Sequence, residues 1–511
     1  MILFFTIFVI LHIHFAHGAN ILAITTLLSP SHHLFHDVYL LELAERGHNI
    51  TLLGHDEDKH GHPNYTHIVM EGVYNQMRKS FDLMKMKDMS DWETIKSLWS
   101  YTELTCMMDF ETQGLQKIIE YPSGFKFDLI IWDINNGQCL FPLIDKFGRP
   151  PVIYINPFLN QPNTFKNVWQ SYIPFMTHTH TDHMTFWQKI KTTFFNILLE
   201  ITREIYLIPR QQELAESHFG KLNFTIKEIE RNVSLMLTNH NPVFNYVEAL
   251  PPNIIPIGGL HIQPKPLPED LKAILDESKH GVILFSLGSN VRCQDLDDDK
   301  IQAILKTFSK LKQDIIWKFG HDKISHISKN VHIRKWVPQN DILAHKNTVL
   351  FITHGGLLSS HEIVYNGVPV IGIPFFLDQL QNIGNFVAKG IGLKLEFEDI
   401  TEDNFYNVIQ EVLNNKSYSE KVKNLSVLYK HRINTPLETV VYWMEYILKF
   451  KTAKHFNLST RDMNLIDVGN LDIILFFSLP FLLFFIIFNC AFYYIFKFLY
   501  KSSNLKKTKV S

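Results

Sequence analysis

The sequence predicts an α/β protein with two doubly wound domains, because one order of elements opens twice along its 511 residues. The first opening starts with the apolar run 20–28, which a loop at 29–33 interrupts. A helical pattern follows and ends at Gly47, and a second strand is expected at 49–53. Strand, loop, helix and strand in this order form the βαβ unit of a parallel sheet.

The second opening repeats this order in the second half of the chain. The run 281–289 is followed by a helix expected over 298–312 and a strand at 314–319. Ligands of such sheets bind beyond the carboxyl ends of the strands. Shorter buried strands are expected at 128–133, 151–155, 331–333, 349–353 and 368–373.

A proline-rich stretch from Pro251 to Pro268 separates the two halves and contains Gly258 and Gly259. Proline fixes φ and has no N–H to donate, so we expect no regular element here. The sequence therefore predicts a first domain at 19–250, a linker at 251–268 and a second domain at 269–455. We expect the two domains to face each other across a cleft.

The C-terminal region indicates a membrane anchor. Residues 473–496 carry no formal charge, and as a helix they would be about 36 Å long, enough to cross a bilayer. The tail 497–511 contains five lysines and no acid, which places it in the cytosol by the positive-inside rule. Lys507 and Lys509 fit either a retrieval signal of the endoplasmic reticulum or a solvated tail.

The net charge of −2 gives no excess of basic residues that would indicate binding to nucleic acid.

The N-terminal region, residues 1–18, is apolar and ends in small residues, as a secretory signal peptide does. Together the two ends predict a single-pass type I protein of the endoplasmic reticulum membrane, with its body in the lumen. Glycosylation sequons agree with this location and occur at Asn64, Asn223, Asn232, Asn424 and Asn457.

The cysteines allow one disulfide at most outside the membrane. Cys490 lies in the apolar segment, which leaves Cys106, Cys139 and Cys293, and the sequence does not choose among them. No CxxC pair supports a zinc site. The histidines of 178–183 lack a metal-ligand spacing, so we expect a polar loop there and no metal.

The segment 336–379 carries the most chemical information. A strand delivers His354-Gly355-Gly356 to the start of a helix, where backbone N–H groups and the helix dipole favour an anion such as a diphosphate. The indole of Trp336 can stack on a base, and Glu362 can accept hydrogen bonds from a ribose diol. Asp378-Gln379 offers an acceptor and an amide to sugar hydroxyls.

In its order of residues this segment closely resembles the signature of the UDP-glycosyltransferase family, membrane-bound enzymes of GT-B fold. The resemblance covers essentially the whole chain, and Leu357-Leu358-Ser359 looks like the invertebrate members. Many relatives have Asn in place of Leu358, so this chain lacks one expected phosphate donor. Further matching motifs are Arg46-Gly47-His48, Phe127-Asp128 to Asp133, Ile257 to His261 and Phe285 to Ser289.

The resemblance implies a role for each residue of the donor site. Trp336 would stack on uracil and Gln339 would contact the uridine. The diphosphate would be held by His354, Gly356, Ser359 and Ser289, the ribose by Glu362, and the sugar by Asp378 and Gln379.

The resemblance also implies a catalytic pair. The family places a general-base histidine fifteen residues before the glycine of Arg-Gly-His, which is His32 here, and its carboxylate partner corresponds to Asp133. An imidazole can take a proton from an acceptor hydroxyl near neutral pH, and a carboxylate stabilises the imidazolium. His33 is the competing assignment.

The predicted function is therefore inverting transfer of a hexose from a UDP-sugar to a hydroxyl of a small lipophilic acceptor, without metal or cofactor. UDP-glucose is favoured over UDP-glucuronate by the invertebrate signature, and acceptor identity and homo-oligomerisation stay open. The alternative is a catalytically inactive, membrane-tethered carrier of hydrophobic ligands. A nicotinamide-dependent oxidoreductase would need a GxGxxG turn, which follows neither first strand.

Overall fold

A computed structural model describes residues 18–507, apart from 58–59, 136, 159–170, 292–295, 321–326, 464–465 and 467–468. The described residues form two compact units, one that extends to Asn457 and one that starts at Leu458. Most of the predicted signal peptide and Cys293 lie outside the described residues.

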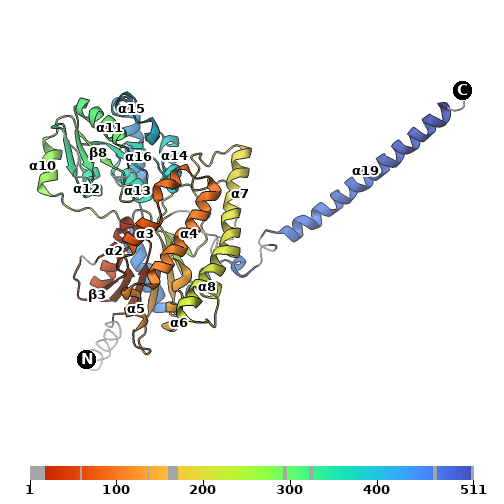
Figure 1. Cartoon of the computed structure of the whole chain (residues 1–511), viewed down its shortest axis with the longest axis horizontal. Helices are drawn as coiled ribbons and strands as arrows, with labels where there is room; N and C mark the ends of the chain where they lie inside the picture. Colours follow the sequence, from red (N-terminus) through yellow and green to blue (C-terminus); the bar gives the residue numbers. More distant parts are fainter. Residues whose placement is uncertain are drawn as a thin grey trace, which may run out of the picture. The chain divides into compact units, whose positions relative to one another are not determined.

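The first unit contains two parallel sheets, which are the two Rossmann-like domains that the sequence predicts (Figure 1). In the described residues their strand orders are β3-β2-β1-β4-β5-β6-β7 and β10-β9-β8-β11-β12-β13. In each sheet the order reverses beside the first strand, β1 or β8, which is where doubly wound sheets bind ligands. Both sheets have nearly continuous apolar strands because helices cover both faces.

The first sheet is built from β1 (Asn20–Thr25), β2 (Asn49–Gly54), β3 (Tyr65–Val69), β4 (Leu129–Asp133), β5 (Val152–Asn156), β6 (Leu235–Thr238) and β7 (Ile254–Pro256). Its helices are α2 (Pro30–Glu45), α3 (Val73–Ser80), α4 (Asp91–Phe110), α5 (Gln113–Ile119), α6 (Pro142–Lys146), α7 (Phe186–Thr202), α8 (Ile208–Phe219) and α9 (Ile226–Arg231). Helix α2 begins with Pro30 in its first turn and ends before Gly47, whose φ of 91° stops the helix.

The second sheet is built from β8 (Val282–Ser286), β9 (Asp314–Lys318), β10 (Val331–Arg334), β11 (Thr348–Thr353), β12 (Val370–Gly372) and β13 (Gly392–Lys394). Its helices are α10 (Glu269–Glu277), α11 (Asp298–Lys310), α12 (Gln339–Ala344), α13 (Leu357–Asn366), α14 (Asp378–Ala388), α15 (Glu402–Asn414) and α16 (Lys416–Lys430). These strands and helices agree with the strands and the helix predicted from 281 to 373.

The proline-rich stretch 251–268 differs from its prediction, because part of it is regular. Residues 254–256 form β7, which pairs in parallel with β6 and places Thr238 opposite Pro256. β7 is the last strand of the sheet, and an edge strand tolerates a proline because one of its sides needs no donor. The first sheet therefore continues into the segment that we expected to be irregular.

Helix α17 (Pro436–Phe450) lies within the range expected for the second domain but packs on the first. Its buried side chains Val440, Met444 and Ile447 belong to the hydrophobic core around β1 and α2. Arg46, the C-cap residue of α2, also reaches Glu445 at 3.3 Å. The chain thus returns to the first domain before the second unit begins.

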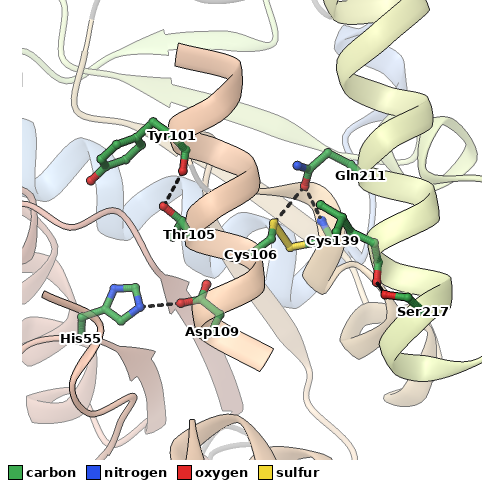
Figure 2. Close-up of a disulfide and its surroundings, with 9 residues drawn as sticks. His55, Tyr101, Thr105, Cys106, Asp109, Cys139, Gln211 and Ser217 are labelled. Atoms are coloured by element: carbon green, nitrogen blue, oxygen red, sulfur yellow. Dashed lines mark hydrogen bonds and ion pairs between the residues drawn. A yellow bond between two sulfur atoms is a disulfide. The ribbon is translucent and has the colours of Figure 1, made fainter. Parts of the chain in front are cut away.

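A disulfide joins Cys106 of α4 to Cys139 (Figure 2). Cys139 lies in η2 (Gln138–Leu140), shortly after β4, and its N–H donates to Oε1 of Gln211 at 3.0 Å. The structure thus selects one of the pairings that the sequence left open. The bridge fixes the loop after Asp133 to helix α4.

In the second unit, α19 (Leu471–Lys507) contains an apolar stretch, 471–500, long enough to cross a membrane. It includes the predicted span 473–496, and Pro480 lies inside it. Its side chains are exposed between Leu471 and Tyr500, as expected of residues that would face lipid.

Candidate active site

The structure brings His32 and Asp133 together, although 101 residues separate them. Asp133 is the last residue of β4, and His32 lies in the first turn of α2, directly after β1. Since β1 and β4 are neighbours in the sheet, their carboxyl ends meet at the same edge. Nδ1 of His32 lies 3.3 Å from Oδ2 of Asp133, and both side chains are buried.

A second histidine, which the sequence analysis missed, reaches the same carboxylate. Nε2 of His36 lies 2.8 Å from Oδ2 of Asp133, closer than His32 does. The other oxygen, Oδ1, accepts from the backbone N–H of Asn135 at 2.9 Å and from its amide at 2.8 Å. Asp133 thus receives four hydrogen bonds, which is as many as a carboxylate can accept.

The competing residue His33 points to other partners. Its Nε2 lies 3.2 Å from Oδ2 of Asp37, and its Nδ1 lies 4.0 Å from Asp56. His33 therefore faces Asp37 and Asp56, whereas His32 faces Asp133, so the geometry fits the assignment of the pair to His32 better.

The electrostatics of Asp133 favour its ionised form. Burial alone would raise its pKa, but the hydrogen bonds from His32 and His36 outweigh burial and hold the pKa well below its usual range. Asp133 is therefore a carboxylate throughout the neutral range, as a partner of an imidazolium has to be.

On the second domain, three of the predicted uridine and phosphate residues form one hydrogen-bonded group. Nε2 of Gln339 donates to Oγ of Ser359 at 2.8 Å and to Oε2 of Glu362 at 2.5 Å. Gln339 begins α12, and the other two lie on α13. Burial raises the pKa of Glu362 to about 7, although the hydrogen bond from Gln339 opposes that rise.

His354 follows β11, and its imidazole packs closely against two glycines. A Cβ at Gly288 would lie 2.5 Å from Cε1 of His354, and a Cβ at Gly356 would lie 2.7 Å from its Nε2. Gly356 is also the N-cap of α13, so the imidazole lies beside the free N–H groups of that helix. Burial lowers the pKa of His354 to about 3, and the nearby Lys318 adds to this effect.

Lys318, at the end of β9, is a further cation that the sequence analysis missed. Its Nζ donates to the backbone oxygen of Gly288 at 3.1 Å and lies 4.3 Å from the ring centre of Trp336. Trp336 is 57% exposed, which leaves an indole surface open. Ser289 follows Gly288 in the turn after β8, so this serine, the cation and the indole lie at one edge of the second sheet.

Asp378 and Gln379 begin α14 and differ in their surroundings. Oδ2 of Asp378 accepts from Nδ2 of Asn382 at 2.9 Å. Burial raises the pKa of Asp378 to about 6, while that hydrogen bond and the nearby His32 oppose the rise. Oε1 of Gln379 accepts from the N–H groups of Phe375 and Phe376, so only its NH₂ group remains for a ligand.

A largely apolar cavity of about 240 Å³ lies between the two domains. Helix α4 contributes Leu98, Trp99 and Tyr101, and the second domain contributes Leu377 and Asp378. Leu377 has a φ of 55°, a costly conformation for leucine, and it directly precedes Asp378. Phe158, whose ring centre lies 4.5 Å from that of His32, also lines the cavity, which therefore reaches the neighbourhood of His32 and Asp133.

In the described residues there is no group of three or more His, Cys, Asp and Glu side chains placed to hold a metal ion. His178 and His180 both reach Oγ1 of Thr192, and His178 also contacts Asp91. Residues 178–183 form a loop, as expected, but His178 within it is buried.

Two Rossmann-like domains with a cavity between them are the architecture of the GT-B fold, and solved glycosyltransferases of this fold are similar in structure to this chain. The family model of UDP-glucoronosyl and UDP-glucosyl transferases matches residues 20–505, and the chain belongs to this family. It is a UDP-glycosyltransferase.

Similar proteins and similar solved structures agree with this family and with this fold. A UDP-glycosyltransferase of Dactylopius coccus is 34% identical over 93% of this chain and 92% of its own. UDP-glucosyltransferase 2 of the same species is 32% identical over 95% and 93%. The crystal structure of Os79 from O. sativa in complex with UDP has a TM-score of 0.56 at 14% identity, over 84% of this chain and 100% of that one. This structural likeness shows the fold.

Proposed function

We propose that this UDP-glycosyltransferase moves glucose from UDP-glucose to a hydroxyl of a small lipophilic acceptor, with inversion at the anomeric carbon. The observation that carries the proposal is the buried pair of His32 and Asp133 at the end of an apolar cavity, with Asp378 of the other domain nearby. An acceptor in the cavity would have a base on one side and the donor sugar on the other.

In the reaction, Nδ1–H of His32 donates to Asp133, so that Nε2 is left to accept a proton. The acceptor hydroxyl gives its proton to Nε2 while its oxygen bonds to the anomeric carbon. The bond between that carbon and the diphosphate oxygen breaks, and UDP leaves. The imidazolium that results is stabilised by the carboxylate, and a positioned base of this kind contributes about 10²–10⁴-fold.

The second domain would stabilise the leaving UDP. The N–H groups at the start of α13, neutral His354 and Ser289 would face the diphosphate, and Lys318 would supply positive charge. Glu362, with Ser359 and Gln339, would hold the uridine, Trp336 would stack on uracil, and Asp378 would accept from a sugar hydroxyl. These groups would neutralise the diphosphate without a metal ion.

The acceptor class and the location follow from separate features. Aromatic and aliphatic side chains dominate the cavity wall, which favours a lipophilic acceptor over a charged one. The apolar helix α19 and the predicted signal peptide support a type I protein of the endoplasmic reticulum membrane. The disulfide agrees with an oxidising lumen.

The test is transfer of radiolabelled sugar by microsomes that contain the chain, with UDP-glucose and UDP-glucuronate offered separately and a panel of phenols as acceptors. We expect β-linked glucosides and a clear preference for UDP-glucose. Products with retained configuration would contradict the mechanism, and a preference for UDP-glucuronate would contradict the donor. UDP binding without transfer to any acceptor would instead favour the inactive carrier.

A further inference from the structure

Helix α2 presents two histidines, His32 and His36, to one carboxylate. They are four residues apart, so they lie on the same face of the helix, one turn from each other. Both contact Oδ2 of Asp133, at 3.3 Å and 2.8 Å respectively. His36 is completely buried and His32 is 3% exposed, so water does not compete for either contact.

The contacts fix the proton of His36. Because Asp133 is a carboxylate, the nitrogen that faces it, Nε2, has to carry the hydrogen. Nδ1 of His36 then accepts from the hydroxyl of Tyr39, which lies 2.9 Å away and is completely buried. A neutral His36 ring therefore forms a hydrogen bond through each of its two nitrogens, as a donor at Nε2 and as an acceptor at Nδ1. Burial lowers the pKa of His36, in agreement with this state.

We propose that His36 is a positioning residue that shares Asp133 with His32 and thereby weakens the carboxylate's hold on the proton of His32. This inference rests on the proposed role of His32 as the base. The hydrogen bond from His36 withdraws negative charge from Oδ2, the oxygen that His32 also contacts. An imidazolium at His32 is then less stabilised than it would be beside an unshared carboxylate.

The hydrogen bond from Tyr39 strengthens this effect. A donor to Nδ1 makes the opposite N–H of an imidazole a better donor, because hydrogen bonds in a chain polarise one another. Tyr39, His36, Asp133 and His32 form such a chain. The other titratable groups near its members are His33, Asp37, Tyr65 and Asp378.

The test is the pH profile of kcat/KM for three variants. His36→Phe removes the donor and fills the space. We expect its acid limb to move to higher pH by about 1, with about tenfold lower kcat/KM at pH 6 and recovery toward wild type at pH 8.5. His36→Gln keeps a neutral donor and should restore most of the wild-type profile. Tyr39→Phe should shift the limb in the same direction by a smaller amount.

Several results would overturn the inference. One is an unchanged acid limb in His36→Phe, and another is a loss that is equal at all pH values and not rescued by His36→Gln. If His36→Phe does not fold, Tyr39→Phe decides, because it deletes one buried hydroxyl, and an unshifted limb there contradicts the chain. His32→Ala is measured in parallel. If that variant keeps wild-type transfer, the proposed base is wrong, whatever His36 does.

Discussion

His32 and His354 occupy related places in the two domains, close to the carboxyl end of β1 and of β11, but their surroundings are opposite. His32 faces the carboxylate of Asp133, at 3.3 Å. His354 is enclosed by Gly288 and Gly356, has Lys318 nearby, and its pKa is lowered to about 3. In the proposed reaction the imidazole of His32 takes up a proton, whereas the imidazole of His354 stays neutral.

The difference shows that neighbours, and not the residue type, decide what a buried histidine does. In the first domain a carboxylate, Asp133, would stabilise an imidazolium at His32. In the second domain burial, with a smaller contribution from the nearby cation Lys318, makes a neutral ring the stable form, and such a ring can donate to an anion without adding charge.

Asp133→Asn should remove the negative charge that distinguishes the surroundings of His32 from those of His354. The amide has no charge to stabilise the imidazolium, and its NH₂ group cannot accept the hydrogen bonds that one of the two carboxylate oxygens accepts. We expect kcat to fall by about 10²–10⁴-fold while the Kd of UDP stays within twofold of wild type. Steady-state kinetics and calorimetric titration with UDP measure the two quantities. Comparable losses in both would mean that the substitution disturbs the whole fold.

Lys318→Met should weaken the binding of UDP to the second domain and leave the pair of His32 and Asp133 unchanged. The substitution removes the cation beside Gly288 and Trp336, and hydrogen bonds to charged groups contribute about 1.5–3 kcal/mol. We expect the Kd of UDP to rise by about 10–100-fold, measured by titration calorimetry. Lys272→Met on α10 is the matched control, because Lys272 pairs with Asp276 on the surface and should leave UDP binding unchanged. A normal Kd in Lys318→Met would exclude a role for this lysine in holding the diphosphate.

The affinity for UDP should depend on pH through Glu362. With a pKa of about 7, this group is mostly protonated at pH 6 and mostly ionised at pH 8, and only the ionised form accepts from both ribose hydroxyls. We therefore expect the Kd of UDP to rise by up to about tenfold from pH 8 to pH 6. Glu362→Gln, which cannot ionise, should flatten this dependence. A dependence that persists in this variant would point to another group.

Gly288→Ala should show that the close packing of His354 requires a glycine at position 288. Gly288 has a φ of 79°, and its new Cβ would meet the imidazole. Gly47→Ala is the control, since Gly47 has a φ of 91° but no atom within 4 Å of a new Cβ. We expect Gly47→Ala to cost about 1 kcal/mol of unfolding free energy, and Gly288→Ala to cost more and to weaken UDP binding as well. Thermal unfolding and UDP titration of both variants distinguish the two costs.

Much of the fold could be predicted from the sequence. The strands around β1, β4, β8 and β11 are short apolar runs with clear breaks, and two repeats of one order of elements give the two sheets. The pair His32 and Asp133 came from a family spacing and not from physics, since 26 histidines offered many candidates. The structure adds the contact between them.

Other features could not be predicted because they depend on distant contacts. The i, i+4 spacing of His32 and His36 was visible, but only the pairing of β1 with β4 shows that both reach one carboxylate. Lys318 ends β9 and lies next to the end of the strand predicted at 314–319, a place where ligands bind, yet a lysine there is usually solvated. Nothing local indicated that α17 packs against the first sheet, because an amphipathic helix does not specify which core it covers.

The most direct test of the central claim is to measure transfer and UDP binding in the same preparation of His32→Ala. We expect glucoside formation to fall by about 10²–10⁴-fold while the Kd of UDP remains that of the wild type. Transfer at the wild-type rate would contradict the account, because the imidazole beside Asp133 would then not be the base.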